Sequence, residues 1–170
     1  MKKLVLLAFI ASFLASAHAV VLGVDAGYLV DSEEAFIAAR IGGPVSANDR
    51  LSHLIEFEIG YTEDSEMGVK GEIVPMLLNY RVESRKAVGW GFFGGIGAGA
   101  ARTEVSGFGL SFDDTSFAAQ AVGGARFAFS ESATLNLGLK YIWIDDVEVA
   151  GVAVEMGDDL GLTLGLSFRF

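Results

Sequence analysis

Apolar and polar residues alternate one by one along residues 160–170. The even-numbered positions are all apolar: Leu160, Leu162, Leu164, Leu166, Phe168 and Phe170. The positions between them are small, polar or charged: Gly161, Thr163, Gly165, Ser167 and Arg169. Because successive side chains of a β-strand point to opposite faces of a sheet, this segment predicts a strand with one apolar and one polar face.

The same two-residue period recurs in seven earlier segments. They span residues 22–30, 35–41, 51–61, 74–82, 90–100, 117–129 and 135–143. No apolar stretch after residue 19 has the length of about 20 residues that a transmembrane helix needs. Only helices and closed barrels satisfy every backbone group inside lipid. The pattern therefore predicts an all-β protein, an eight-stranded antiparallel up-and-down transmembrane β-barrel. A soluble lipocalin-like barrel would place its apolar residues inside and its charges outside.

The connections between these segments predict an orientation. An even number of strands places both termini on one side, which we expect to be periplasmic, with short turns at 83–87 and 130–132 and a moderate one at 43–50. Longer external loops are expected at 62–70, 103–114 and 144–156, and a very short one at 31–34. Pro75 cannot donate to a ladder, so we expect a bulge or a locally missing hydrogen bond there.

Aromatic residues at the predicted outward positions fall into two groups. Tyr80 and Trp90 lie toward the periplasmic ends of their segments, whereas Tyr28, Tyr61, Tyr141 and Trp143 lie toward the external ends. Aromatic rings with a polar edge are suited to the boundary between lipid and water. We predict that these six residues belong to two aromatic girdles.

The first nineteen residues have the pattern of an export signal. Lys2 and Lys3 precede an apolar run that ends at Leu14, and small residues at Ala17 and Ala19 suit cleavage after Ala19. The run is too short for a membrane anchor. We therefore predict a cleaved signal peptide at residues 1–19 and one barrel domain at residues 20–170.

Composition narrows the function further. The net charge of −10 disfavours nucleic-acid binding, because phosphates would be repelled. The chain has no cysteine, so disulfides cannot hold it together. Of its two histidines, His18 lies within the predicted signal peptide and only His53 lies in the barrel. Neither a metal site nor a cofactor is predicted.

Charged residues at the predicted inward positions form the main candidate site. They are Asp25, Arg40, Glu56, Glu58, Arg81, Arg126, Lys140 and Arg169. Since buried charges are costly unless they are paired, we predict a polar plug that neutralises itself inside the narrow barrel. We expect Arg81 to pair with Glu56 or Glu58 on the neighbouring strand. The alternative is a gated narrow channel, in which rearranged ion pairs open a path.

Two other groups of residues have side chains that could bind a metal or act in catalysis. Acidic residues gather in the expected external loops: Glu63, Asp64, Glu66, Asp113, Asp114, Asp145, Asp146 and Glu148. Asp158 and Asp159 follow at the start of the last strand. Such oxygen ligands can bind Ca²⁺ or Mg²⁺, but their spacing matches no EF-hand. The favoured interpretation is a solvated surface whose like charges resist aggregation. Ser52 and His53 are adjacent, so they should face opposite sides of a strand and cannot form a nucleophile and its base.

Several stretches resemble one family of proteins. They are residues 74–80 (VPMLLNY), 91–99 (GFFGGIGAG), 136–141 (NLGLKY) and 162–170 (LTLGLSFRF). The chain resembles the small outer-membrane β-barrels: the OmpA transmembrane domain, OmpX and the opacity-protein-like barrels. The resemblance implies an integral protein of the outer membrane of a Gram-negative-type bacterium. It also implies that Leu166, Phe168 and Phe170 form a signal that the barrel-assembly machinery reads.

Together these patterns favour a structural or surface-interaction role for a barrel with a plugged, polar lumen. A narrow passive pore for ions or small solutes is the alternative, and a lipid-modifying enzyme is disfavoured. The expected partners are outer-membrane lipids and lipopolysaccharide, with the assembly machinery and periplasmic chaperones during biogenesis. We expect a monomer without cofactors.

Overall fold

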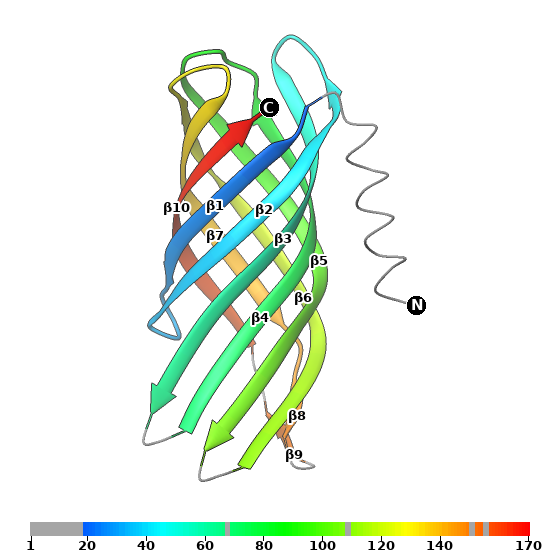
Figure 1. The fold of residues 1–170 in the computed structure, drawn as a ribbon, viewed down its shortest axis with the longest axis vertical. Helices are drawn as coiled ribbons and strands as arrows, with labels where there is room; N and C mark the ends of the chain where they lie inside the picture. The colour runs from blue at the N-terminus through cyan, green and yellow to red at the C-terminus, as the bar shows by residue number, and fades with distance from the viewer. Residues whose placement is uncertain (1–18, 67–68, 108–109, 150–151, 155–156) are drawn as a thin grey trace.

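The computed structural model describes residues 19–66, 69–107, 110–149, 152–154 and 157–170. Within these residues, strands β1–β7 and β10 close into one barrel, and β8 and β9 form a separate hairpin (Figure 1). The strands are β1 (Val21–Leu29), β2 (Glu34–Ala47), β3 (Leu51–Glu66), β4 (Val69–Ser84), β5 (Gly89–Gly107), β6 (Leu110–Ala128), β7 (Ala133–Ile144), β8 (Val147–Val149), β9 (Val152–Val154) and β10 (Gly157–Arg169). The predicted eight-stranded antiparallel up-and-down barrel is confirmed.

The barrel closes where its first and last strands meet. Strands β1 and β10 pair from Val21 opposite Arg169 to Leu29 opposite Gly161. Beyond this ladder, the backbone N–H of Phe170 donates to the carbonyl of Val20 at 2.9 Å. No strand edge of the barrel is left without a neighbour among the described residues. We call this end of the barrel the terminal end, and the opposite end, with the β3–β4 and β5–β6 hairpins, the hairpin end (Figure 1).

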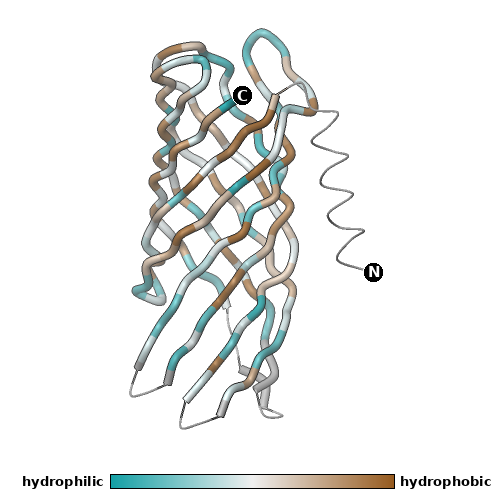
Figure 2. The backbone as a smooth tube through the Cα atoms, in the orientation of Figure 1, coloured by the Kyte–Doolittle hydropathy of each residue, from teal (hydrophilic) through white to brown (hydrophobic). Residues whose placement is uncertain are grey.

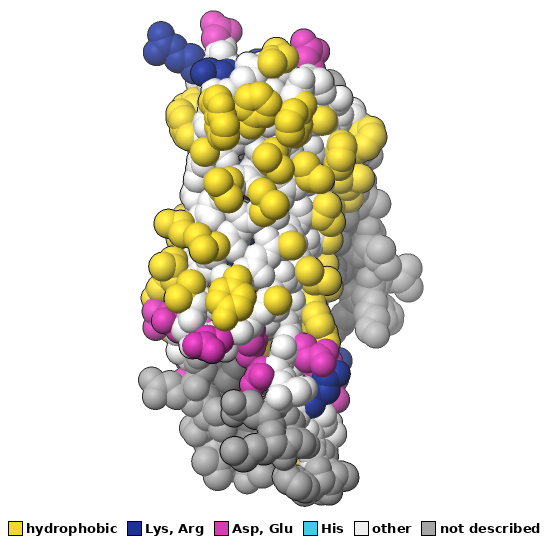
Figure 3. All heavy atoms as spheres, turned by 90° about the vertical axis from the view of Figure 1, so that its left-hand side faces the viewer, with side chains coloured by type: hydrophobic (Ala, Val, Ile, Leu, Met, Phe, Trp, Pro, Cys, Tyr) yellow, Lys and Arg dark blue, Asp and Glu magenta, His cyan; other side chains and the backbone are white. Residues whose placement is uncertain are grey.

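The alternation read from the sequence places side chains as predicted. In β10, Leu162 and Leu164 are more than half exposed on the outer wall, while Gly161 and Gly165 are buried. Apolar residues lie along the strands and polar residues gather near the turns (Figure 2). On the face shown in Figure 3, apolar side chains cover the wall and charged side chains lie toward its two ends. The outer surface therefore suits a hydrocarbon layer between two wet regions.

Two loops predicted at the hairpin end, residues 62–70 and 103–114, are mostly parts of strands, so these predictions were wrong. Residues 62–66 and 69–70 continue β3 and β4, and residues 103–107 and 110–114 continue β5 and β6. These parts of the strands have polar residues on both faces, so the apolar alternation stops before the strands do. At the terminal end, β2 likewise extends to Ala47. The predicted 144–156 loop contains the short β8–β9 hairpin.

Pro75 interrupts its ladder without shifting the register. Ile59 pairs with Met76 and Thr62 with Ile73, while no pairing joins residues 60–61 to residues 74–75. The register is the same before and after this gap. Of the two predicted alternatives, a bulge and a locally missing hydrogen bond, the structure shows the second. A register shift does occur at the other proline, between Pro44 and Ser46 in β2.

The predicted signal peptide lies outside the described residues except for Ala19. In the part of the chain that is described, no helix is long and apolar enough to cross a membrane.

Candidate functional site

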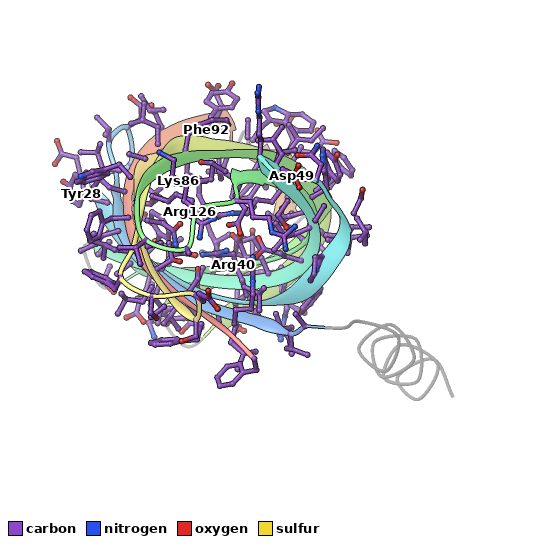
Figure 4. All side chains as sticks on the ribbon, turned by 90° about the horizontal axis from the view of Figure 1, so that it is seen from above. Tyr28, Arg40, Asp49, Lys86, Phe92 and Arg126 are labelled. Carbon is purple, nitrogen blue, oxygen red and sulfur yellow. The ribbon has the colours of Figure 1, made fainter. Side chains whose placement is uncertain are left out.

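The barrel interior contains the charges that the sequence predicted there, with one addition. All eight predicted residues face the lumen, and Arg40 and Arg126 are seen inside the barrel in Figure 4, whereas Tyr28 and Phe92 point outward. Glu83 joins them, 7% exposed. These nine residues, five cations and four carboxylates, form three clusters.

Arg40 is the centre of the first cluster. Its Nε and Nη2 donate to the two oxygens of Asp25 at 2.5 and 3.0 Å, which is a two-point contact. Its Nη1 lies 3.1 Å from both carboxylate oxygens of Glu56. One planar guanidinium therefore neutralises two buried carboxylates from the neighbouring strands β1 and β3, a geometry that Lys could not provide.

Glu58 is the centre of the second cluster. Its Oε1 lies 2.6 Å from Lys140 Nζ, on the far side of the barrel. Its Oε2 accepts hydrogen bonds from Asn79 at 2.9 Å and from Gln120 at 3.0 Å. Gln120 also donates to Asn79 Oδ1 at 2.8 Å. The cluster thus links β3, β4, β6 and β7 across the lumen.

Glu83 is the centre of the third cluster, at the terminal end. Its Oε1 lies 2.9 Å from Arg126 Nη1 and 2.7 Å from Arg169 Nη2. Arg126 is held further by the Ser84 carbonyl at 2.7 Å and by Thr134 Oγ1 at 2.9 Å. Sequence reasoning missed Glu83, because it placed residues 83–87 in a turn. The sequence did contain a signal for Glu83. It lies two residues after Arg81, so the two side chains are expected on the same inward face of the strand.

The predicted pairing of Arg81 with Glu56 or Glu58 was wrong. Those two carboxylates are occupied by Arg40 and Lys140. Arg81 instead donates to Asn136 Oδ1 at 2.9 Å, and its guanidinium carbon lies 4.0 Å from the centre of the Phe93 ring. Glu83 is its nearest carboxylate, at 3.8 Å. Stacking on Phe93 and hydrogen bonding to an amide thus replace the expected ion pair.

Between the clusters the lumen is closely filled. Cavities beside the Arg40 and Glu83 clusters measure about 20 and 10 Å³, room for a single water molecule at most. Glycines provide space for the long side chains: a Cβ at Gly97 would collide with Asn79, and one at Gly165 with Asp25. The charged part of the interior is therefore a plug in this conformation.

Toward the hairpin end the interior becomes apolar, which the prediction of a polar lumen did not include. A cavity of about 240 Å³ lies there, and we call it the apolar chamber. Its apolar walls are formed by Leu29, Phe36, Ile73, Pro75, Ile142 and Ile144. Lys140 also lines it, with its ammonium 4.9 Å from the centre of the Phe36 ring.

Asp159 anchors the β1–β2 turn at the rim of this chamber. Its two carboxylate oxygens accept the backbone N–H groups of Asp31 at 3.0 Å and Ser32 at 2.9 Å. These two hydrogen bonds hold the short turn in place.

The predicted girdle residues all lie on the outer wall. Tyr80 and Trp90 lie toward the terminal end, where Tyr80 Oη contacts His53 Nδ1 at 2.6 Å and Trp90 packs edge-on against Phe127. Tyr28, Tyr61, Tyr141 and Trp143 lie toward the hairpin end. Leu166 and Phe168 line the outer face of β10, and Phe170, which directly follows this strand, is 75% exposed.

The hairpin-end acids do not converge on a metal site in the described part of the chain, where no group of three His, Cys, Asp or Glu residues is placed to hold an ion. Glu63 contacts Tyr61 and Lys70, and these contacts lower the pKa of its carboxyl. Glu66 and Glu148 have side chains outside the described residues. Ser52 is 2% exposed and faces the lumen, so it lies on the opposite face of β3 from the outward His53, as predicted.

Comparison with known proteins identifies the family. The family model of the outer membrane protein beta-barrel domain matches residues 6–170. The chain belongs to this family. It is accordingly an integral protein of the outer membrane, as the alternation and the resemblance implied. No curated protein matches it in sequence.

Solved structures of this type share its fold at low sequence identity. Neisserial surface protein A (NspA) has a TM-score of 0.61 and 15% identity, over 89% of this chain and 96% of its own. The N-terminal barrel of Pseudomonas aeruginosa OprF has a TM-score of 0.60 and 15% identity, over 91% and 98%. The outer membrane enzyme PagL has a TM-score of 0.55 and 11% identity, over 87% and 98%. Because these folds carry different activities, the likeness establishes the architecture alone.

Proposed function

We propose that this protein is a structural and surface-interaction component of the outer membrane, with a lumen that does not conduct. The observation that carries the proposal is the filled interior, which holds three clusters of buried charges. Two of them, around Glu58 and Glu83, join strands on opposite sides of the barrel. The cavities beside them are too small for a hydrated ion to pass. Catalysis forms no part of the proposal, since Ser52 and His53 lie on opposite faces of the wall.

Conductance in planar bilayers tests this proposal. The purified barrel is expected to give no reproducible single-channel steps, because the Arg40 and Glu58 clusters obstruct the lumen. Shortening both Arg40→Ala and Lys140→Ala should open a path and produce small steps. The matched control shortens lipid-facing residues instead, Leu137→Ala and Leu139→Ala. Reproducible steps from the unaltered protein would favour the narrow-pore alternative and refute the proposal.

The orientation is part of the proposal: the terminal end lies in the periplasm and the hairpin end outside. The long wet hairpins of β3–β4 and β5–β6 support it, because outer-membrane barrels have short periplasmic turns and longer external connections. Since the chain has no cysteine, single cysteines can report sidedness. A membrane-impermeant maleimide should label Ser106→Cys in intact cells and Glu131→Cys only after the outer membrane is permeabilised. The reverse labelling pattern would show that the terminal end lies outside and the hairpin end in the periplasm.

The lipid-facing end of β10 is proposed to be read by the barrel-assembly machinery, with chaperones guiding the chain and lipopolysaccharide surrounding the finished barrel. Phe170 supports this, as it is exposed and adjoins the closing seam with Val20. Phe170→Ala should reduce the amount of heat-modifiable barrel in the outer membrane several-fold. Phe129→Ala removes an equally outward ring near the same end and should have little effect. Equal amounts from the two variants would show that Phe170 only ends the strand.

A further inference from the structure

We propose that the apolar chamber binds a small organic ammonium, an aromatic ring or short alkyl chain that carries one positive charge. This inference goes beyond the proposed structural role and does not depend on whether the lumen conducts. It rests on three features of the chamber: its size and apolar walls, the carboxylates at its rim, and the way Lys140 is held at its inner end.

The size and lining of the chamber suit one small apolar group. A cavity of about 150 Å³ lined by aliphatic and aromatic side chains is known to hold benzene, so the 240 Å³ here accommodates a substituted ring. Leu, Ile, Pro and Phe side chains form its apolar walls, and most of its polar residues lie at the rim. Ser32 and Asp158, which also line the chamber, are exposed, so the chamber reaches solvent. Burial of a ring against these walls supplies the binding free energy.

The rim determines the charge of the ligand. Glu34, Asp158 and Asp159 are among the described residues that line the chamber, and Lys140 is the one cation among them. The Asp158 carboxylate is hydrogen-bonded to Tyr141 on the outer wall, so Glu34 and the buried Asp159 provide the inward negative charge. Glu34 accepts a hydrogen bond from Thr62 Oγ1 at 2.7 Å, which fixes its carboxylate at the rim. Further exposed acids at the same end, Asp145 and Asp146, strengthen the negative field. A cation is therefore attracted to the rim, and a carboxylate of the same shape is repelled.

The inner end of the chamber determines the orientation of the ligand. Lys140 would attract an anion, but its ammonium lies 2.6 Å from Glu58 and close to the Phe36 ring. The Lys140 charge is thus already neutralised. An anionic group would also have to bury its own charge among apolar walls. The favourable pose places the ring beside Phe36 and the ammonium beside the Glu34 carboxylate.

Isothermal titration of the barrel in nanodiscs tests the inference, with empty nanodiscs as the blank for partition into lipid. The probes are 2-phenylethylammonium, 2-phenylethanol and phenylacetate, which share one ring and differ in charge. We expect saturable binding in the order cation, alcohol, anion, with the cation roughly three- to tenfold tighter than the alcohol at low salt. Glu34→Gln should reduce the cation affinity toward that of the alcohol and leave the alcohol affinity unchanged.

A filling variant separates the chamber from the rest of the surface. Leu29→Trp should weaken the cation roughly tenfold or more, since the indole occupies the space that the ring requires. Leu22→Trp places the same change on the lipid-facing side of β1 and should bind as the unaltered protein does. Ile144→Phe provides a second filling variant should Leu29→Trp fail to fold. Three results would each overturn the inference. They are no saturable binding of the cation, cation binding by the filling variants as tight as by the unaltered barrel, and tighter binding of phenylacetate than of the cation.

Discussion

Replacing Arg40 with methionine is expected to lower the free energy of unfolding by about 3–5 kcal/mol, as is typical when one partner of a buried ion pair is removed. Methionine keeps the apolar stem of arginine and replaces the guanidinium, so the loss reports mainly charge and hydrogen bonds rather than a large cavity. Asp25 and Glu56 would remain inside the barrel without the guanidinium that now contacts both. Urea unfolding of the refolded barrel in lipid vesicles, followed by tryptophan fluorescence, measures the change.

The matched variants identify the cause. Arg40→Met combined with Asp25→Asn and Glu56→Gln removes the uncompensated carboxylates and should recover a large part of the lost stability. Arg50→Met makes the same substitution at an exposed site of the terminal end and should change stability by no more than about 0.5 kcal/mol. If the triple variant is less stable than Arg40→Met alone, packing rather than charge pairing dominates at this site.

The barrel and the identity of its inward charges could be predicted because both follow from the alternation of side chains between the two faces of a strand. Once a strand is bounded by lipid on one side, a shift of one residue would expose every apolar side chain to the lumen, so register is strongly specified. Arg126 and Lys140 therefore lie inside as expected. This alternation does not determine which charged side chains form ion pairs inside the lumen. Arg40 reaches two strands and Lys140 reaches across the barrel to Glu58, and such contacts depend on barrel diameter and strand stagger.

The apolar chamber was missed for a related reason. A two-residue period predicts that apolar residues lie on the outer wall. An apolar residue at an inward position is therefore visible in the sequence only as a short interruption of the alternation. The runs Tyr28–Val30, Ala35–Ile37 and Met76–Leu78 are such breaks, and their central residues Leu29, Phe36 and Leu77 are buried inside. Consecutive apolar residues in a barrel strand thus indicate an apolar interior at that level. The strand ends beyond the lipid boundary were missed because both of their faces meet water.

Gly124→Ala is expected to disrupt the wall of the barrel, lowering the free energy of unfolding by about 3 kcal/mol, the upper end for overpacked sites, and reducing the yield of folded protein. Gly124 faces inward, directly opposite Gly138 on β7. A Cβ there would collide with the Leu137 carbonyl oxygen and lie 2.5 Å from Gly138 Cα. These are backbone atoms, which cannot rotate away, so β6 and β7 would have to separate.

The adjacent residue provides the control for this variant. Gly123 faces outward, and a Cβ there would meet only the Phe93 carbonyl oxygen at 3.7 Å, an ordinary contact. Gly123→Ala should therefore fold like the unaltered barrel, or slightly better, because alanine loses less backbone entropy than glycine on folding. Heat-modifiable migration and urea unfolding of the two variants, prepared side by side, measure the difference. Equal stability would mean that β6 and β7 lie farther apart than the Gly124–Gly138 contact requires, and the close packing that brings Lys140 toward Glu58 would have to be revised.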